Sequence, residues 1–99
     1  MSGQVRRARV VIDGRVQGVF FRDACRREAA AAGVTGWVAN RADGRVEAVF
    51  QGTPEGVARM VEWCRHGPPH ATVTAIHVTD EPPDPGDPGD AAGTGFRIR

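Results

Sequence analysis

The order in which two hydrophobic periods follow one another restricts the fold of this chain more than any other feature. Strand-like alternation and helical spacing occur in the order strand, helix, strand, strand, helix, strand. This order predicts an α+β fold, in which an antiparallel sheet has both helices packed on one face. The predicted elements are strands at 7–13, 35–40, 45–52 and 71–79, and helices that begin at residues 21 and 54.

Turn and capping residues support these boundaries. Gly33 predicts the end of the first helix, and the Ala-Asp-Gly run at 42–44 predicts a hairpin between the two central strands. Thr53 and Pro54 supply an N-cap and a proline at the first helical position. The second helix is expected to end at the Gly-Pro-Pro run at 67–69. The complete order is that of the ferredoxin-like βαββαβ sandwich.

The last third of the chain is less regular. The apolar residues of 71–79 change parity midway, and a bulge near Thr74-Ala75 would return both sets to the buried face. Residues 82–94 are rich in Pro, Gly and Asp and have no period, which predicts a flexible acidic loop. The closing residues, 96–99, are long enough only for a short extra C-terminal strand at the edge of the sheet.

The length of the chain favours a single domain over residues 1–99. No apolar run approaches the ~20 residues that cross a bilayer, and charges interrupt the N-terminal segment, so we expect a cytoplasmic protein without a membrane anchor. We also expect a monomer. Cys25 and Cys64 lack the spacing of a zinc site and an obvious histidine partner, and are predicted to be buried core residues. Trp37 and Phe50 alternate as core residues do.

Charge is distributed unevenly along the chain. Five of the 12 acidic residues lie between positions 80 and 90, so the other seven stand against all 13 basic residues, every one an arginine. The body of the chain is therefore basic, which favours an anionic ligand. The chain is also rich in Ala, Gly and Pro, whose codons are rich in G and C, so the number of arginines alone does not indicate nucleic-acid binding.

A glycine-bearing loop, GRVQGVFFR at 14–22, leads from the first strand into the first helix. Glycine permits positive φ, so successive backbone N–H groups can converge on an anion. The start of the helix adds N–H groups and the positive end of its dipole. Arg22 lies in this first turn, where a cation is disfavoured unless an anion faces it. A phosphate-sized dianion would resolve that conflict, because a guanidinium can bind two phosphate oxygens at once.

Each of these features also has an ordinary explanation. A glycine-bearing loop can be a tight turn, and Arg22 can be a solvated surface charge. Asn40, at the end of a predicted strand, can be a turn former that tolerates left-handed geometry. Taken singly, none of the three identifies a site.

Together the motifs resemble a known family. The segments GRVQGVFFR at 14–22 and GWVANRADGRVE at 36–47 look like the paired signature of the acylphosphatases. The resemblance continues through FQGTPEGVARMVEWCRHGPPHATVTAIHV at 50–78 and the closing FRI, and so covers nearly the whole chain. It implies a ferredoxin-like enzyme that hydrolyses the carboxyl–phosphate anhydride of acyl phosphates by in-line attack of a water, without a metal, a cofactor or a covalent intermediate.

The resemblance also implies roles for individual residues. Arg22 matches the arginine that binds the substrate, and Asn40 matches the asparagine that orients the attacking water. The residues whose backbone N–H groups match the phosphate cradle are Gly14, Arg15, Val16, Gln17, Gly18, Val19 and Phe20. The expected partner is a small-molecule acyl phosphate, and inorganic phosphate or sulfate is expected to occupy the same site.

Two other functions stay open at this point. One is a non-catalytic regulatory domain that binds phosphate or an acyl phosphate without turning it over. The other is an RNA-binding module, since RNA-recognition domains share this order of elements. Those domains stack bases on aromatic residues of the open sheet face, whereas strands 7–13 and 45–52 offer Arg9, Val11, Glu47 and Val49 on that parity. We therefore expect no nucleic-acid partner.

Overall fold

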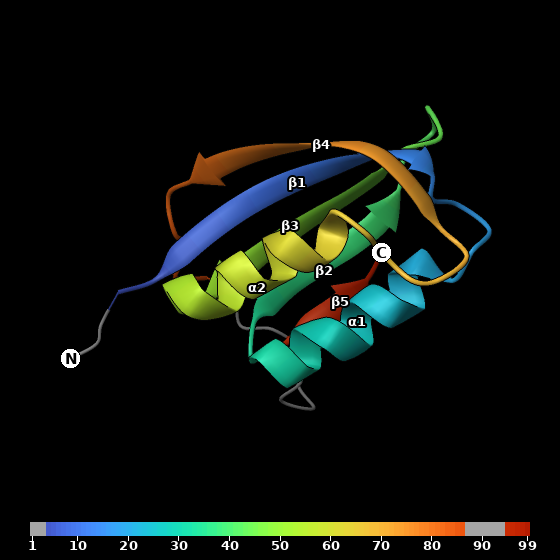
Figure 1. Cartoon of the computed structure of the whole chain (residues 1–99). Coiled ribbons are helices and arrows are strands. Elements are labelled where there is room, and N and C mark those ends of the chain that lie inside the picture. The colour runs from blue at the N-terminus through green and yellow to red at the C-terminus, as the bar shows by residue number, and fades with distance from the viewer. Residues whose placement is uncertain (1–3, 87–94) are drawn as a thin grey trace.

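The computed structural model describes residues 4–86 and 95–99 of the 99-residue chain. Seven elements follow one another in the expected order, with a fifth strand at the C-terminal end (Figure 1). They are β1 (Arg6–Arg15), α1 (Phe21–Ala32), β2 (Thr35–Asn40), β3 (Val46–Gly52), α2 (Pro54–Cys64), β4 (Thr72–Glu81) and β5 (Phe96–Ile98).

The strands form one sheet in the order β4-β1-β3-β2-β5, with both helices on the same face (Figure 1). The pairs β4–β1, β1–β3 and β3–β2 are antiparallel, as predicted. β5 differs, because it runs parallel to β2 and makes the sheet mixed. Phe96 of β5 is buried and stacks on Phe50 of β3, with ring centroids 5.6 Å apart. The short last strand therefore completes the core and does not only extend the sheet.

The start of α2 and the end of α1 lie where their capping residues predicted them. The Oγ1 of Thr53 accepts a hydrogen bond from the Gly56 N–H at 3.0 Å and caps α2, while Gly33 ends α1 in the left-handed conformation. α2 ends at Cys64, three residues before the predicted stop at 67–69, because the chain tightens into a turn in which the Arg65 N–H bonds to the Glu62 carbonyl. Neither helix in the described part of the chain is long and apolar enough to cross a membrane.

The bulge predicted in β4 is confirmed. Asp13 of β1 pairs with Ala75 and Gly14 pairs with Val73, so Thr74 is the extra residue. The bulge lets Val73 and Ile76 both pack against the core. Of the predicted loop at 82–94, residues 87–94 lie outside the described residues, and Asp84 is held at its backbone N–H and carbonyl by the side chain of Gln51.

The open face of the sheet carries an aromatic ring that was assigned to the core. Trp37 pairs with Val49 on the face away from the helices, and the guanidinium of Arg99 lies 4.4 Å from the centre of its ring. The prediction for Trp37 was wrong, because strand alternation gives two faces and does not say which one is covered. Ion pairs from Arg9 to Glu47 and Glu81 occupy the same face. A single aromatic ring beside paired arginines does not form the stacking surface of an RNA-recognition domain.

Candidate active site

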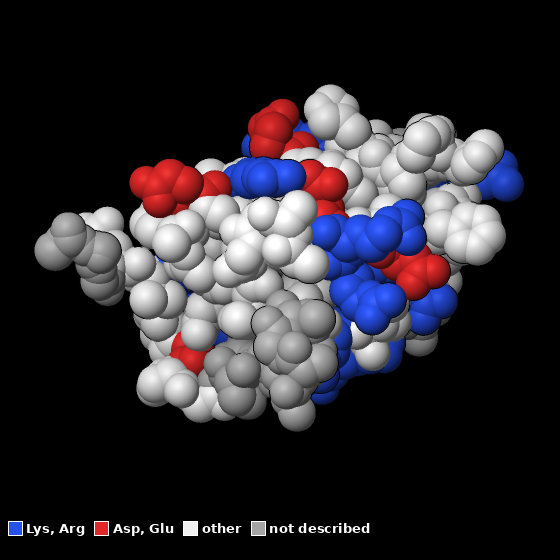
Figure 2. Space-filling view, turned by 90° about the horizontal axis from the view of Figure 1, so that it is seen from below, with Lys and Arg blue, Asp and Glu red and all other residues white. Residues whose placement is uncertain are grey.

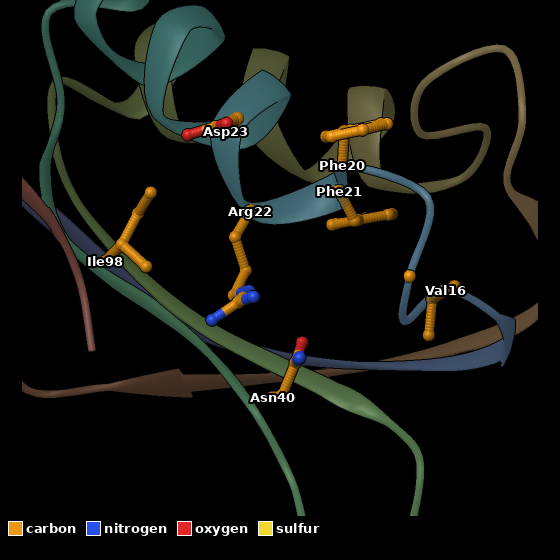
Figure 3. Close-up of a pocket in the computed structure, with 8 residues that line it drawn as sticks. Val16, Phe20, Phe21, Arg22, Asp23, Asn40 and Ile98 are labelled. Atoms are coloured by element: carbon orange, nitrogen blue, oxygen red, sulfur yellow. The ribbon is translucent and has the colours of Figure 1, made fainter.

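One cavity of about 450 Å³ opens at the N-terminus of α1 (Figure 3). It lies where the loop after β1, the end of β2 and the end of β5 meet. Its volume exceeds that of a phosphate ion, so part of the space is left for another group. The residues that line it are Val16, Gly18, Phe20, Phe21, Arg22, Asp23, Asn40 and Ile98.

The loop between β1 and α1 is held by two valines that point into the core. The side chains of Val16 and Val19 are 1% and 5% exposed, which anchors the loop to the protein. Gly18 and Phe20 have φ of 76° and 64°, values that bring successive N–H groups to one side of the chain. Among the described residues, the N–H groups at 16–20 donate no hydrogen bond to another protein group. These unmatched donors form an anion-binding concavity.

Phe20 is the most strained residue of this loop. It is the only non-glycine residue with positive φ in the part of the chain that is described. A left-handed conformation costs a residue with a side chain about 1–2 kcal/mol. The ring does not recover this cost by packing, since Phe20 is 75% exposed. Its carbonyl accepts the first helical hydrogen bond of α1, from the Ala24 N–H at 3.1 Å.

Arg22 projects from the first turn of α1 into the cavity, with its guanidinium directed toward Asn40 (Figure 3). Within residues 4–86 and 95–99 it has no ion-pair or hydrogen-bond partner, although Asp23 also lines the cavity. Two further exposed arginines, Arg26 and Arg27, follow it on α1. Figure 2 shows basic side chains gathered on one part of this face with few acids among them. The positive end of α1 and these side chains together favour an anion in the cavity.

Asn40 is the last residue of β2, and its position depends on the hairpin that follows it. The Arg41 N–H bonds to the Arg45 carbonyl at 2.8 Å, and the Gly44 N–H bonds to the Arg41 carbonyl at 3.2 Å. The carboxylate of Asp43 accepts the Arg45 N–H, and this hydrogen bond holds the pKa of Asp43 below its ordinary value. The turn is therefore closed on itself immediately after Asn40.

Gln17 joins this hairpin to the loop before α1. Its side-chain amide donates to the carbonyl of Arg41 at 2.8 Å and to that of Arg45 at 3.0 Å. The two segments that carry the N–H donors and Asn40 are thus held at one spacing. The sequence analysis treated Gln17 only as a backbone donor and missed this side-chain role, because it depends on a hairpin 24 residues away.

Not every predicted site residue lines the cavity. Gly14 and Arg15 belong to the end of β1, Val19 is buried and Gln17 faces the hairpin. The remaining predicted residues do line it, and Phe21, Asp23 and Ile98 join them. Asp23 could have been predicted as a cavity residue from the sequence, because it follows Arg22 directly. Ile98 could not, because only the pairing of β5 with β2 brings it there.

Other reactive side chains lie elsewhere. Cys25 and Cys64 are fully buried, and burial raises the pKa of the Cys64 thiol to about 12 and that of Cys25 well above its ordinary value. Neither thiol is disposed to act as a nucleophile. Among the described residues, no group of three or more His, Cys, Asp or Glu side chains is placed to hold a metal ion.

Comparisons with known proteins agree on one family. The family model for Acylphosphatase matches residues 8–98. A relative named acylphosphatase from Rubrobacter xylanophilus is 54% identical over 97% of this chain and 82% of its own length. An acylphosphatase structure from Bacillus subtilis superposes with a TM-score of 0.83 at 36% identity, covering 97% of this chain and 99% of that one. One from Coxiella burnetii reaches 0.84 at 32% identity, with both chains covered completely.

Proposed function

Because the chain belongs to the acylphosphatase family, we propose that it hydrolyses acyl phosphates in the cavity at the N-terminus of α1. Arg22 and the N–H groups of the preceding loop bind the phosphoryl group, and Asn40 orients the attacking water. The observation that carries this assignment is the set of unmatched N–H donors beside a guanidinium without a counterion in the described part of the chain. A phosphoryl dianion satisfies both at once.

The reaction requires few groups from the protein. The leaving carboxylate is the anion of a carboxylic acid, which is stable at neutral pH, so its departure needs no general acid. Phosphoryl transfer passes through a loose transition state with charge spread over three oxygens, and the protein contributes mainly position and charge stabilisation. The N–H donors and Arg22 supply that stabilisation in a fixed geometry.

Asn40 acts on the water. Its side-chain oxygen accepts a hydrogen bond from the water and holds it in line with the bond to the leaving carboxylate, while its NH₂ group is available to a phosphoryl oxygen. As the oxygen of the water forms its bond to phosphorus, the P–O bond to the acyl group breaks. The proton of the water passes to a phosphoryl oxygen, which yields a carboxylate and inorganic phosphate without a covalent enzyme intermediate.

The assignment is tested by hydrolysis of benzoyl phosphate in the presence of EDTA. Arg22→Gln is expected to raise KM and lower kcat, because the arginine holds the phosphoryl group in both the bound and the transition state. Asn40→Ala is expected to lower kcat with KM largely retained. Arg26→Gln is the matched control, since it removes the same charge one helical turn further along α1, outside the cavity lining.

Two results would contradict the proposal. Activity of Arg22→Gln equal to that of Arg26→Gln would show that the cavity arginine has no special role. Loss of wild-type activity on addition of EDTA would show that a metal takes part. Phosphate bound with no detectable turnover would instead favour the non-catalytic regulatory domain.

Finer properties follow as part of the same proposal. Inorganic phosphate and sulfate occupy the cavity and inhibit competitively with respect to the acyl phosphate, because they match its phosphoryl half. We also propose that the protein acts as a monomer in the cytoplasm. Sedimentation of the purified protein and the dependence of KM on phosphate concentration test these two statements.

A further inference from the structure

Two exposed apolar side chains border the cavity. Among the described residues, the most exposed large hydrophobic residues are Val5, Phe20, Val78 and Ile98. Phe20 and Ile98 both line the cavity, although they are far apart in the sequence. Phe20 is the most exposed of the four, at 75%, and Ile98 is 38% exposed. Two of these four exposed hydrophobic residues therefore lie at the cavity.

The backbone alone does not explain a phenylalanine at position 20. The φ of 64° there directs the N–H groups of the loop outward, and glycine or asparagine reaches this conformation at lower cost. The ring packs into no core, unlike that of the next residue, Phe21, which is 2% exposed and contacts Trp63 edge-on at 5.2 Å. Phe20 thus combines an unfavourable backbone with an uncovered ring, and a contact with substrate gives that ring a function.

The line of attack indicates which part of the substrate reaches this ring. In Figure 3, Asn40 lies on the sheet side of the Arg22 guanidinium, and Phe20 lies on the helix side, at the start of α1. Attacking and leaving oxygens lie roughly in line through phosphorus. With the water held at Asn40, the leaving acyl group extends away from β2, toward the rim that Phe20 forms. The cavity has room for this group beside the phosphoryl group.

We propose that Phe20 determines specificity for the acyl group, with Ile98 as a second apolar contact, so that the enzyme favours acyl phosphates with an aromatic or large apolar acyl group. This inference rests on the proposed function, because it requires the phosphoryl group at Arg22 and the water at Asn40. An aromatic acyl group can lie against the Phe20 ring in an offset or edge-on arrangement. An acetyl or carbamoyl group is too small to cover the ring.

The test compares kcat/KM for benzoyl phosphate with kcat/KM for acetyl phosphate in the same enzyme. Taking this ratio in each variant cancels the intrinsic reactivity of the two substrates and any shared loss caused by a disturbed cradle. Phe20→Asn tolerates the left-handed backbone and removes the ring. It is expected to lower the ratio about two- to tenfold, the gain typical of an aromatic pair. Phe20→Tyr should retain the wild-type ratio, and so should Val5→Asn, which removes an exposed apolar side chain outside the cavity lining.

A measurement on the wild type alone supports the same distinction. Benzoate, the product that would contact the ring, is expected to inhibit at lower concentration than acetate in the presence of phosphate. An unchanged ratio in Phe20→Asn, or equal inhibition by the two carboxylates, would overturn the specificity role while leaving the proposed function intact. Failure of the wild type to hydrolyse either substrate would overturn the proposed function and, with it, this inference.

Discussion

Gln17→Met removes the two hydrogen bonds that join the loop before α1 to the β2–β3 hairpin, while it nearly preserves the volume of the side chain. The two carbonyls that accept these bonds are not left without partners. The carbonyl of Arg45 still accepts the Arg41 N–H, and the carbonyl of Arg41 still accepts the Gly44 N–H. The variant therefore leaves no buried acceptor unsatisfied, and it loses only the net stabilising free energy of the two hydrogen bonds.

The magnitude follows from these contacts. The loss of two hydrogen bonds at about 0.5–1.5 kcal/mol each lowers the free energy of unfolding by about 1–3 kcal/mol. At about 4–8 °C per kcal/mol in a domain of this size, Tm falls by roughly 4–24 °C. The effect on catalysis is larger, because the N–H donors and Asn40 lose their common spacing. A misplacement of about 1 Å can cost about a hundredfold in rate. We expect kcat to fall ten- to a hundredfold, with a smaller change in KM because Arg22 and the donors remain.

Gln51→Met is the matched control. Gln51 makes the same kind of amide contacts, to the backbone N–H and carbonyl of Asp84 and to Arg7, but toward the far end of β3. It lies five residues along β3 from Val46, the partner of Asn40, and hence roughly 17 Å away. Its loss should destabilise the protein at least as much as the loss of Gln17 without lowering kcat. The assay is thermal unfolding and steady-state hydrolysis of benzoyl phosphate for both variants at one temperature below both transitions. An equal kcat for the two variants would refute the positioning role of Gln17.

Three further predictions concern other parts of the molecule. Gly14→Ala should lower the free energy of unfolding by about 2–5 kcal/mol, because its Cβ would lie 2.1 Å from the Thr72 carbonyl oxygen at a φ of 128°. Gly44→Ala is the control: no atom from a non-neighbouring described residue lies within 4 Å of its Cβ, so chemical denaturation should show a loss of only about 1–2 kcal/mol. The raised pKa values of Cys25 and Cys64 keep both thiols neutral in the fold, so their effect on stability should be constant between about pH 7 and 8.5, and the free energy of unfolding should fall as pH rises from about 8.5 toward 12. Iodoacetamide labelling of the native enzyme at pH 8 should be slow and should not precede loss of activity. If the basic side chains around α1 steer the anionic substrate, kcat/KM should fall with added NaCl more steeply than kcat, and a flat salt profile would contradict this.

Much of the fold could be predicted because it depends on local properties. Alternation, helical spacing and the caps at Thr53 and Gly33 are encoded within a few residues, and the elements begin close to where these signals place them. The bulge at Thr74 could be predicted for the same reason, because a change of parity within one strand requires an extra residue in that strand. The family could also be recognised from the sequence, because its motifs are short and contiguous.

Other features required the assembled molecule. Alternation put Trp37 and Val38 on opposite faces of β2 but did not say which face the helices would cover, and Trp37 lies on the uncovered one. The parallel pairing of β5 with β2, which brings Ile98 to the cavity, comes from three residues that carry no signal of direction.

The sequence by itself determined which chemical groups the protein holds and in what local form: a glycine-bearing turn before a helix, an arginine in its first turn and an asparagine at the end of a strand. Only the tertiary structure decided that these groups open onto one cavity, that Gln17 sets their spacing and that Phe20 remains uncovered at the rim. The physical reason is that local signals act over a few residues. A cavity is formed by segments that meet only when the sheet and the helices have packed.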